Sequence, residues 1–295
     1  MTARSFGGKE TAARLRASAA ETVAALAAAG VAPRLAIVVA TREESAAWYV
    51  RSLSGAAARL GIATDVTELP ADAPADEITA ALTALSADPA VHGIVLQAPL
   101  PAGLRLPEIA AAIATAKDVD GASPLSLGLL TAGLPTFAPA TAQAVVQLLD
   151  FHGVDLAGRR VVVVGRSLVV GKPLALLLLG RDATVTVGHS RTADLASITR
   201  QAEVLVVAAG RRGLITAEHV RPGALVVDVG TNTAPDGSVA GDVDAAGVAA
   251  IAGGLSPVPG GVGPVTTAQL LLNTVTAAAG QAGLSSVRNE IRPPK

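Results

Sequence analysis

The fold of this chain is decided by the stretch Val161-Val162-Val163-Val164-Gly165-Arg166-Ser167-Leu168-Val169-Val170-Gly171-Lys172-Pro173. The run of valines predicts a buried strand, and Gly165 allows the backbone to turn tightly after it. The residues from Gly171 onward predict a helix, whose free N–H groups in the first turn can hold a phosphate. The glycine spacing, G-x-x-x-x-x-G, differs from the G-x-G-x-x-G of dinucleotide-binding loops. An ordinary strand–turn–helix connection is therefore the alternative to a dinucleotide-binding loop.

Continuous apolar segments of the same kind recur along the chain, and alanine-rich helical segments separate them. This apolar character is typical of strands that are buried on both faces of a parallel sheet. The alternation predicts the α/β class, with two doubly wound domains, the second a Rossmann-type dinucleotide-binding domain. The predicted strands are residues 35–40, 91–96, 161–164, 184–187, 204–208 and 225–229, and the predicted helices include residues 10–29, 46–60, 75–85, 140–151 and 173–179.

The length of 295 residues is typical of two domains, each large enough to bury its own core. The boundary is predicted at the stretch rich in glycine and proline that ends at Pro139. We therefore expect a first domain at residues 1–139 and the dinucleotide-binding domain at residues 140–266. Residues 267–295 are expected to form a C-terminal segment whose helix packs back on the first domain.

The composition excludes several classes of protein. The chain has no cysteine, so it cannot form a disulfide or bind a metal through thiolates. Its 23 Lys+Arg against 24 Asp+Glu give a net charge of −1, and no basic cluster is present to neutralise nucleic-acid phosphates. The four histidines are not spaced as metal ligands. We therefore expect no nucleic-acid partner and no catalytic metal.

The low charge also raises the question of a membrane, because charged residues make up only 16% of the chain and the mean hydropathy is +0.50. Two segments without charge, residues 121–149 and 245–287, are longer than the roughly 20 residues that a spanning helix needs. Both are interrupted by proline and glycine, most densely between Pro257 and Pro264, where the backbone could not satisfy its hydrogen bonds in lipid. We expect a cytoplasmic protein with no membrane partner.

The segment after the next strand, Gly188-His189-Ser190-Arg191, indicates which dinucleotide would bind. Sites that prefer NAD usually carry an acidic residue here to hold the ribose 2′-hydroxyl, and none is present. Arg166, Ser190 and Arg191 instead offer donors and positive charge that suit a 2′-phosphate. This pattern favours NADP, and a solvated polar turn is the alternative.

Two polar residues elsewhere are candidates for holding a substrate. In Lys117-Asp118-Val119-Asp120-Gly121, an ionised Asp120 could accept two hydrogen bonds from the amino-pyrimidine edge of a pterin, although Asp-Gly is also an ordinary turn. Gln97 follows a predicted strand, near the edge at which open α/β sheets bind their ligands. Taken alone, each residue is also compatible with an ordinary surface position.

Taken together, these segments resemble the methylenetetrahydrofolate dehydrogenase/cyclohydrolase family of bifunctional folate enzymes. The resemblance spans nearly the whole chain. Its most specific part is the run Pro257-Val258-Pro259-Gly260-Gly261-Val262-Gly263-Pro264-Val265-Thr266. The other matching segments are Gly8-Lys9, Pro33-Arg34-Leu35-Ala36, Tyr49-Val50, Lys117-Asp118-Val119-Asp120-Gly121, Gly165-Arg166-Ser167, His189-Ser190-Arg191-Thr192 and Val227-Asp228-Val229-Gly230.

The resemblance implies a folate-binding, catalytic first domain, NADP on the second domain, tetrahydrofolate in a cleft between them, and a homodimer. By position, Tyr49 would stack on the folate, Gln97 would lie beside the reacting centre, and Asp120 would anchor the pterin. The residues expected to contact or shape the NADP site are Gly165, Arg166, Ser167, Gly171, Ser190, Arg191 and the backbone at Thr231.

The chain departs from the family's pattern mainly on the folate side. The family places a lysine four residues after the tyrosine, where this chain has Leu53, or Ser52 if the alignment shifts by one; no lysine occurs between Lys9 and Lys117. Ala122-Ser123-Pro124 stands where the family usually has Phe-His-Pro. Two further departures are Pro139-Ala140-Thr141-Ala142 in place of Pro-Cys-Thr-Pro and Thr231 in place of isoleucine.

These departures bear on the second of the family's two reactions. Hydride transfer depends chiefly on holding two rings face to face, whereas hydration of the methenyl cation needs proton transfer. We therefore expect NADP-dependent oxidation of 5,10-methylenetetrahydrofolate, with weak or absent cyclohydrolase activity. The alternatives are a divergent paralogue that acts on another pterin-like or one-carbon substrate, and an NADP-binding protein without catalysis.

Overall fold

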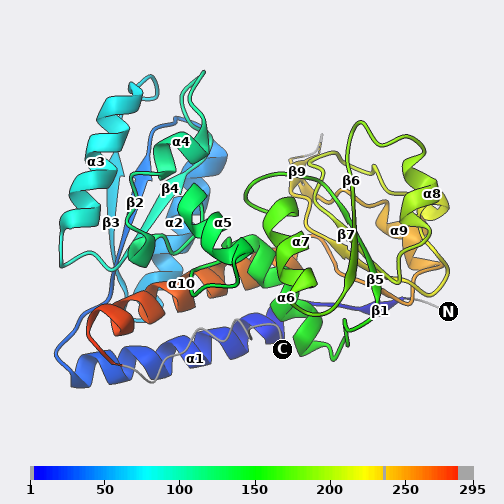
Figure 1. Cartoon of the computed structure of the whole chain (residues 1–295), viewed down its shortest axis with the longest axis horizontal. Coiled ribbons are helices and arrows are strands. Elements are labelled where there is room, and N and C mark those ends of the chain that lie inside the picture. The colour runs from blue at the N-terminus through cyan, green and yellow to red at the C-terminus, as the bar shows by residue number, and fades with distance from the viewer. Residues whose placement is uncertain (1–2, 235–236, 285–295) are drawn as a thin grey trace. The chain divides into compact units, whose positions relative to one another are not determined.

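The computed structural model describes residues 3–234 and 237–284, which fall into two compact units (Figure 1). Residues 3–13 and 141–266 form one unit, called here the Rossmann unit. Residues 14–140 and 267–284 form the other, called here the small-sheet unit. Each unit is described by itself.

The small-sheet unit is built on a three-stranded parallel sheet in the order β3-β2-β4, with β2 in the centre. Its strands are β2 (Arg34–Val39), β3 (Ala63–Glu68) and β4 (Gly93–Gln97). Its helices are α2 (Glu44–Arg59), α3 (Ala75–Ala87), α4 (Leu106–Ala110) and α5 (Pro124–Thr131), with a 3-10 turn at Thr115–Lys117 and most of α1 (Lys9–Ala28) and α10 (Val262–Gln281).

Alternate residues of β2 enter two different hydrophobic cores, as the period of two along a strand requires. Leu35, Ile37 and Val39 pack with buried residues of α1, α2 and α10 on one face of the sheet. Ala36 and Val38 pack on the other face with residues of α3 and α4. Both faces of this short sheet are therefore covered, which explains why β2 is apolar from Leu35 to Val39.

The Rossmann unit has a six-stranded parallel sheet in the order β1-β11-β8-β7-β5-β6. Helix α7 packs against β5 and β6, α8 against β6, and α9 against β11. The strands are β1 (Arg4–Ser5), β5 (Arg160–Val164), β6 (Thr184–Gly188), β7 (Val204–Val207), β8 (Leu225–Asp228) and β11 (Gly254–Leu255), with a small hairpin of β9 (Asn232–Thr233) and β10 (Val239–Ala240). The helices are α6 (Ala140–Phe151), α7 (Gly171–Leu179), α8 (Leu195–Thr199) and α9 (Ala245–Ala249), with a 3-10 turn at Ala217–His219.

The predicted α/β class and Rossmann-type sheet are confirmed, and all six predicted strands occur within two residues of the expected positions. One expectation is wrong in detail. We expected Arg4 and Ser5 in the first domain, but they form strand β1 and pair in parallel with β11 at the edge of the Rossmann sheet. Residues 285–295 of the expected C-terminal segment lie outside the described residues. No helix among the described residues is both long and apolar enough to span a membrane.

Candidate functional site

The loop between β5 and α7 is shaped by two glycines that no larger residue could replace without a backbone shift. Gly165 has φ +130°, and a Cβ there would lie 2.2 Å from the carbonyl oxygen of Ala208, at the end of β7. A Cβ at Gly171 would lie 2.2 Å from the carbonyl oxygen of Gly165. The strand, the loop and the first turn of α7 therefore approach one another as closely as their backbones allow. Such a cradle fits a dinucleotide phosphate against the start of the helix.

Ser167 and Arg166 lie on the exposed side of this loop. The Ser167 Oγ accepts hydrogen bonds from the backbone N–H groups of Val170 and Gly171, at 3.1 and 3.4 Å. A hydroxyl that accepts in this way can still donate its own proton. Ser167 therefore both holds the loop in shape and offers a donor to a phosphate oxygen.

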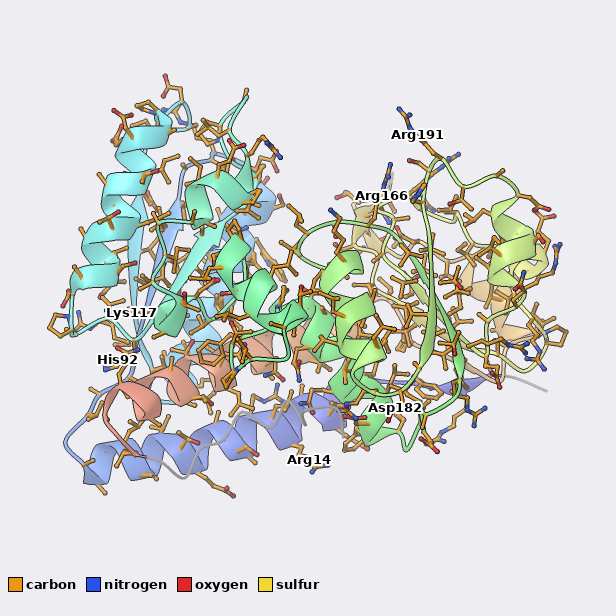
Figure 2. The ribbon with its side chains drawn as sticks, viewed as in Figure 1. Arg14, His92, Lys117, Arg166, Asp182 and Arg191 are labelled. Carbon is orange, nitrogen blue, oxygen red and sulfur yellow. The ribbon has the colours of Figure 1, made fainter. Side chains whose placement is uncertain are left out.

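The turn after β6 brings a second arginine to the same edge of the Rossmann sheet. The His189 N–H donates to Thr192 Oγ1 at 2.8 Å, and the Arg191 N–H donates to His189 Nδ1 at 3.2 Å, which closes the turn. Ser190 and Arg191 are exposed on it. Because β5 and β6 are parallel neighbours, Arg166 and Arg191 both follow the carboxyl ends of adjacent strands, and both extend from the same end of the unit in Figure 2. Two guanidinium groups there suit a ribose phosphate.

The loop after β8 carries the remaining residue expected at the cofactor site. Thr231 is exposed, and it follows Gly230, whose backbone N–H donates to the Asp228 carboxylate at 2.9 Å. The Asp228 carboxylate therefore fixes the backbone of this loop, while the Thr231 side chain remains exposed to solvent. The contact of the Thr231 backbone with the cofactor stays a prediction, and isoleucine and threonine would be equivalent in it.

In the small-sheet unit, Tyr49 and Leu53 lie one turn apart on α2. The buried face of this helix consists of Ala46, Val50, Leu53 and Ala57. Leu53 is 1% exposed and belongs to the hydrophobic core that includes Leu270 and Leu271 of α10. Tyr49 is partly buried against the same core. The position at which the family resemblance calls for lysine is thus an ordinary apolar core position in this chain.

The Asp120 carboxylate lies close enough to Tyr49 to affect the pKa of its phenol. Burial raises the pKa of the Tyr49 phenol well above its usual range, and the negative charge of Asp120 raises it further. Burial first, and then the negative charge of Asp118, raise the pKa of the Asp120 carboxyl, while a hydrogen bond from the backbone of Ala140 lowers it; the net result is a rise from 3.8 to about 7. At neutral pH the Asp120 carboxyl therefore exchanges between its neutral and ionised forms.

The loop that carries Asp120 is fixed by Asp118, to which the sequence assigned no role. The fully buried Asp118 carboxylate accepts from the backbone N–H groups of Ala122 and Ser123, each at 2.9 Å, and from the Ser126 hydroxyl. Gly121 has φ +60°, and a Cβ there would lie 2.5 Å from the backbone nitrogen of Pro139. These constraints hold the backbone on both sides of Asp120.

Gln97 and Lys117 lie at opposite ends of β4. Gln97 ends the strand, pairs with Val39, and donates from its Nε2 to the carbonyl oxygen of Ala98 at 2.7 Å. Lys117 lies near His92, just before the strand begins, as Figure 2 shows. Its Nζ donates to the carbonyl oxygen of Asp88 at 2.6 Å, beyond the end of α3. Lys117 therefore serves as a buried structural contact and cannot replace a lysine at position 53.

The parallel sheet, the glycine cradle and the two arginines define a class of protein, the dinucleotide-binding proteins of Rossmann type. Comparison with known proteins gives the family. The model of the tetrahydrofolate dehydrogenase/cyclohydrolase NAD(P)-binding domain matches residues 139–282, and that of the catalytic domain matches residues 6–120. The chain therefore belongs to the tetrahydrofolate dehydrogenase/cyclohydrolase family.

Individual relatives cover almost the whole chain. The bifunctional protein FolD of Nocardia farcinica is 60% identical over 279 residues, which are 95% of this chain and 99% of that protein. The structure of the bifunctional FolD of Campylobacter jejuni is 38% identical with a TM-score of 0.90, over 93% of this chain and 98% of that one. FolD of Trypanosoma brucei, described as complexed with NADP and an inhibitor, is 36% identical with a TM-score of 0.89, over 95% and 98% of the two chains. The family model's description as NAD(P)-binding confirms the prediction of a nicotinamide dinucleotide as the cofactor.

Proposed function

We propose that this chain oxidises 5,10-methylenetetrahydrofolate to 5,10-methenyltetrahydrofolate with NADP, and that its methenyltetrahydrofolate cyclohydrolase activity is weak or absent. Membership of the family supports the first half. One observation carries the second half: Leu53, 1% exposed in an apolar core, occupies the position that the family resemblance assigns to a lysine.

The dehydrogenase half needs positioning more than proton exchange. NADP, when bound, supplies the nicotinamide that accepts the hydride. Ser167 would contact its pyrophosphate and Arg166 and Arg191 its 2′-phosphate, and the close approach at Gly165 and Gly171 leaves room for it. Ser190 and the Thr231 backbone would complete this set of contacts.

On the folate side, Tyr49 would stack on the ring system, Asp120 would anchor the pterin, and Gln97 would lie beside the reacting carbon. Holding the folate and the nicotinamide in the correct relative orientation accounts for a large part of the rate of hydride transfer between them. An uncharged Leu53 does not interfere with any of these roles.

The cyclohydrolase half needs a group that exchanges a proton while water adds to the methenyl cation. A leucine side chain has no such group. The Lys117 ammonium is held by backbone carbonyl oxygens at the opposite end of β4 from Gln97. Loss of a positioned proton-transfer group typically costs about 10² to 10⁴ in rate. Methenyltetrahydrofolate should therefore accumulate as a product.

The test follows NADPH formation and decay of the methenyl compound separately in purified protein. We expect NADPH to form while the methenyl compound decays near its rate in buffer. Leu53→Lys should raise the hydrolysis rate by about 10² or more. Leu53→Met, which keeps a long side chain of similar volume without the amine, is the matched control and should leave hydrolysis unchanged.

Two results would contradict the proposal, one for each half. Rapid hydrolysis of the methenyl compound by the unchanged protein, abolished by Gln97→Ala, would show that the cyclohydrolase works without the lysine. Failure to reduce NADP with methylenetetrahydrofolate, with NADP still bound, would exclude the dehydrogenase. The expected homodimer and cytoplasmic location belong to the same proposal, and light scattering of the purified chain tests the first of them.

A further inference from the structure

Two buried carboxylates, Asp228 and Asp242, lie at the carboxyl end of the Rossmann sheet. Asp228 ends β8 and is 3% exposed, while Asp242 follows β10 and is fully buried. Burial of a carboxylate is costly unless strong hydrogen bonds compensate for the lost water, so the partners of this pair need an explanation.

The partners are mainly backbone amides from separate segments. Asp228 accepts from the N–H groups of Gly230 at 2.9 Å, Asp242 at 3.0 Å and Val243 at 3.0 Å. One oxygen of Asp242 accepts from the N–H groups of Ala209 at 2.7 Å and Gly210 at 2.9 Å. The other accepts from Asn232 Nδ2 at 2.8 Å. The pair therefore ties together the segments after β7, after β8 and after β10.

The packing around these carboxylates leaves no space for adjustment. A Cβ at Gly230 would lie 2.5 Å from Asp242 Oδ1, and a Cβ at Gly241 would lie 1.8 Å from Asp228 Oδ2. The backbone can reach the carboxylates only because both positions are glycine. The three segments are thus held in one arrangement rather than in several similar ones.

This arrangement adjoins the dinucleotide cradle. The strand order places β7 between β8 and β5, and ligands of open parallel sheets bind at the carboxyl ends of their strands. The carbonyl oxygen of Ala208 leaves no room for a side chain at Gly165. The next two residues, Ala209 and Gly210, donate their backbone N–H groups to Asp242. Asn232 follows directly after Thr231, the expected cofactor contact.

We propose that Asp242, supported by Asp228, is a positioning residue for the cofactor. Its carboxylate fixes the backbone after β7 and after β8 in the arrangement that NADP binds, without touching NADP itself. Hydrogen bonds from amides to a carboxylate are among the stronger ones in proteins, which makes this arrangement stiff. This inference rests on the family's NAD(P)-binding domain and is independent of whether position 53 supports the cyclohydrolase.

The test uses the polarity of the bond between Asp242 and Asn232. Asp242→Asn can still accept from Ala209 and Gly210, but its amide then faces the amide of Asn232, and two donors oppose each other. We expect the Kd for NADP to rise about tenfold, the change that a loss of about 1.4 kcal/mol produces. The exchange variant, Asp242→Asn with Asn232→Asp, again places a donor opposite an acceptor between these two side chains. It loses the longer hydrogen bond from Asn232 Nδ2 to the Ala240 carbonyl oxygen, at 3.3 Å, so it should recover part of the affinity.

Three measurements separate positioning from general stability: the Kd for NADP, the KM for each substrate, and the thermal unfolding midpoint. The KM for NADP should rise while the KM for methylenetetrahydrofolate stays within about twofold. Asp244→Asn is the matched control, because Asp244 also accepts from a backbone amide, that of Gly247 at 3.3 Å, but caps α9 instead. It should leave the Kd for NADP unchanged.

The proposal is overturned if Asp242→Asn folds and binds NADP as tightly as the unchanged protein. If Asp242→Asn does not fold, Asn232→Asp takes its place, since two carboxylates then face each other and NADP binding should again weaken. If the exchange variant binds NADP no better than the single variant that was measured, Asp242→Asn or Asn232→Asp, the proposal is also overturned.

Discussion

Replacement of Asp120 by asparagine should stabilise the small-sheet unit at neutral and alkaline pH. The pKa of Asp120 is raised from 3.8 to about 7, first by burial and then by Asp118. Because the folded state holds this proton more tightly than the unfolded state, the contribution is fully present below about pH 4 and is lost as the pH rises to about 7. At about 1.36 kcal/mol per pH unit, the loss is at most about 4 kcal/mol.

Asparagine has the shape of the carboxyl group and keeps an oxygen for the N–H of Ala140, but it carries no charge to bury. The free energy of unfolding of Asp120→Asn, minus that of the unchanged protein, should therefore be near zero at pH 4. It should rise toward this upper limit of about 4 kcal/mol at pH 8. Folate binding should weaken, because an amide cannot accept two hydrogen bonds from the pterin edge as a carboxylate does.

The assay is urea unfolding at a series of pH values, followed by far-UV circular dichroism. The single tryptophan, Trp48, is 64% exposed on α2, so its fluorescence would change little on unfolding and the helical signal is the better readout. Asp72→Asn, at an exposed position of the same unit, is the control and should show a difference near zero throughout. A difference for Asp120→Asn that does not change between pH 4 and pH 8, or that falls, would refute this reasoning.

Two further predictions concern the cofactor site. Gly165→Ala should abolish NADP binding and lower stability by about 1–3 kcal/mol, because its Cβ would meet the Ala208 carbonyl oxygen. Gly180→Ala, whose Cβ would make only ordinary contacts, should do neither, and dinucleotide titration with thermal unfolding measures both. Replacing Arg166 or Arg191 by glutamine should raise the Kd for NADP about tenfold and change that for NAD little, since only NADP carries the 2′-phosphate. Equal losses for both dinucleotides in a titration would contradict that assignment.

The fold could be predicted where burial on both faces makes a strand apolar throughout. The valines of β5 and the alternating cores of β2 are examples. Strand β3 could not be found, because it lies at the sheet edge and its residues are mostly exposed, so Thr64 and Asp65 give no apolar signal. The two-residue strands β1 and β11 depend entirely on pairing between distant segments.

The candidate site was predictable only where a local pattern carries it. Gly165 and Gly171 stand beside a strand of valines, and their steric role follows from that context. The role of Asp118 depends on a turn that closes five to eight residues later, at Ser123 and Ser126. Asp242 depends on contacts with residues up to 33 positions away, which no local spacing indicates.

The two cores that meet along β2 have a consequence for cooperativity. Leu35, Ile37 and Val39 belong to one core and Ala36 and Val38 to the other, so a single backbone segment is shared by both layers. Loss of packing on either face therefore displaces the six residues of β2, and these residues also form the backbone hydrogen bonds to β3 and β4. The small-sheet unit should therefore open as one block, with amide exchange in β2 protected by its full unfolding free energy.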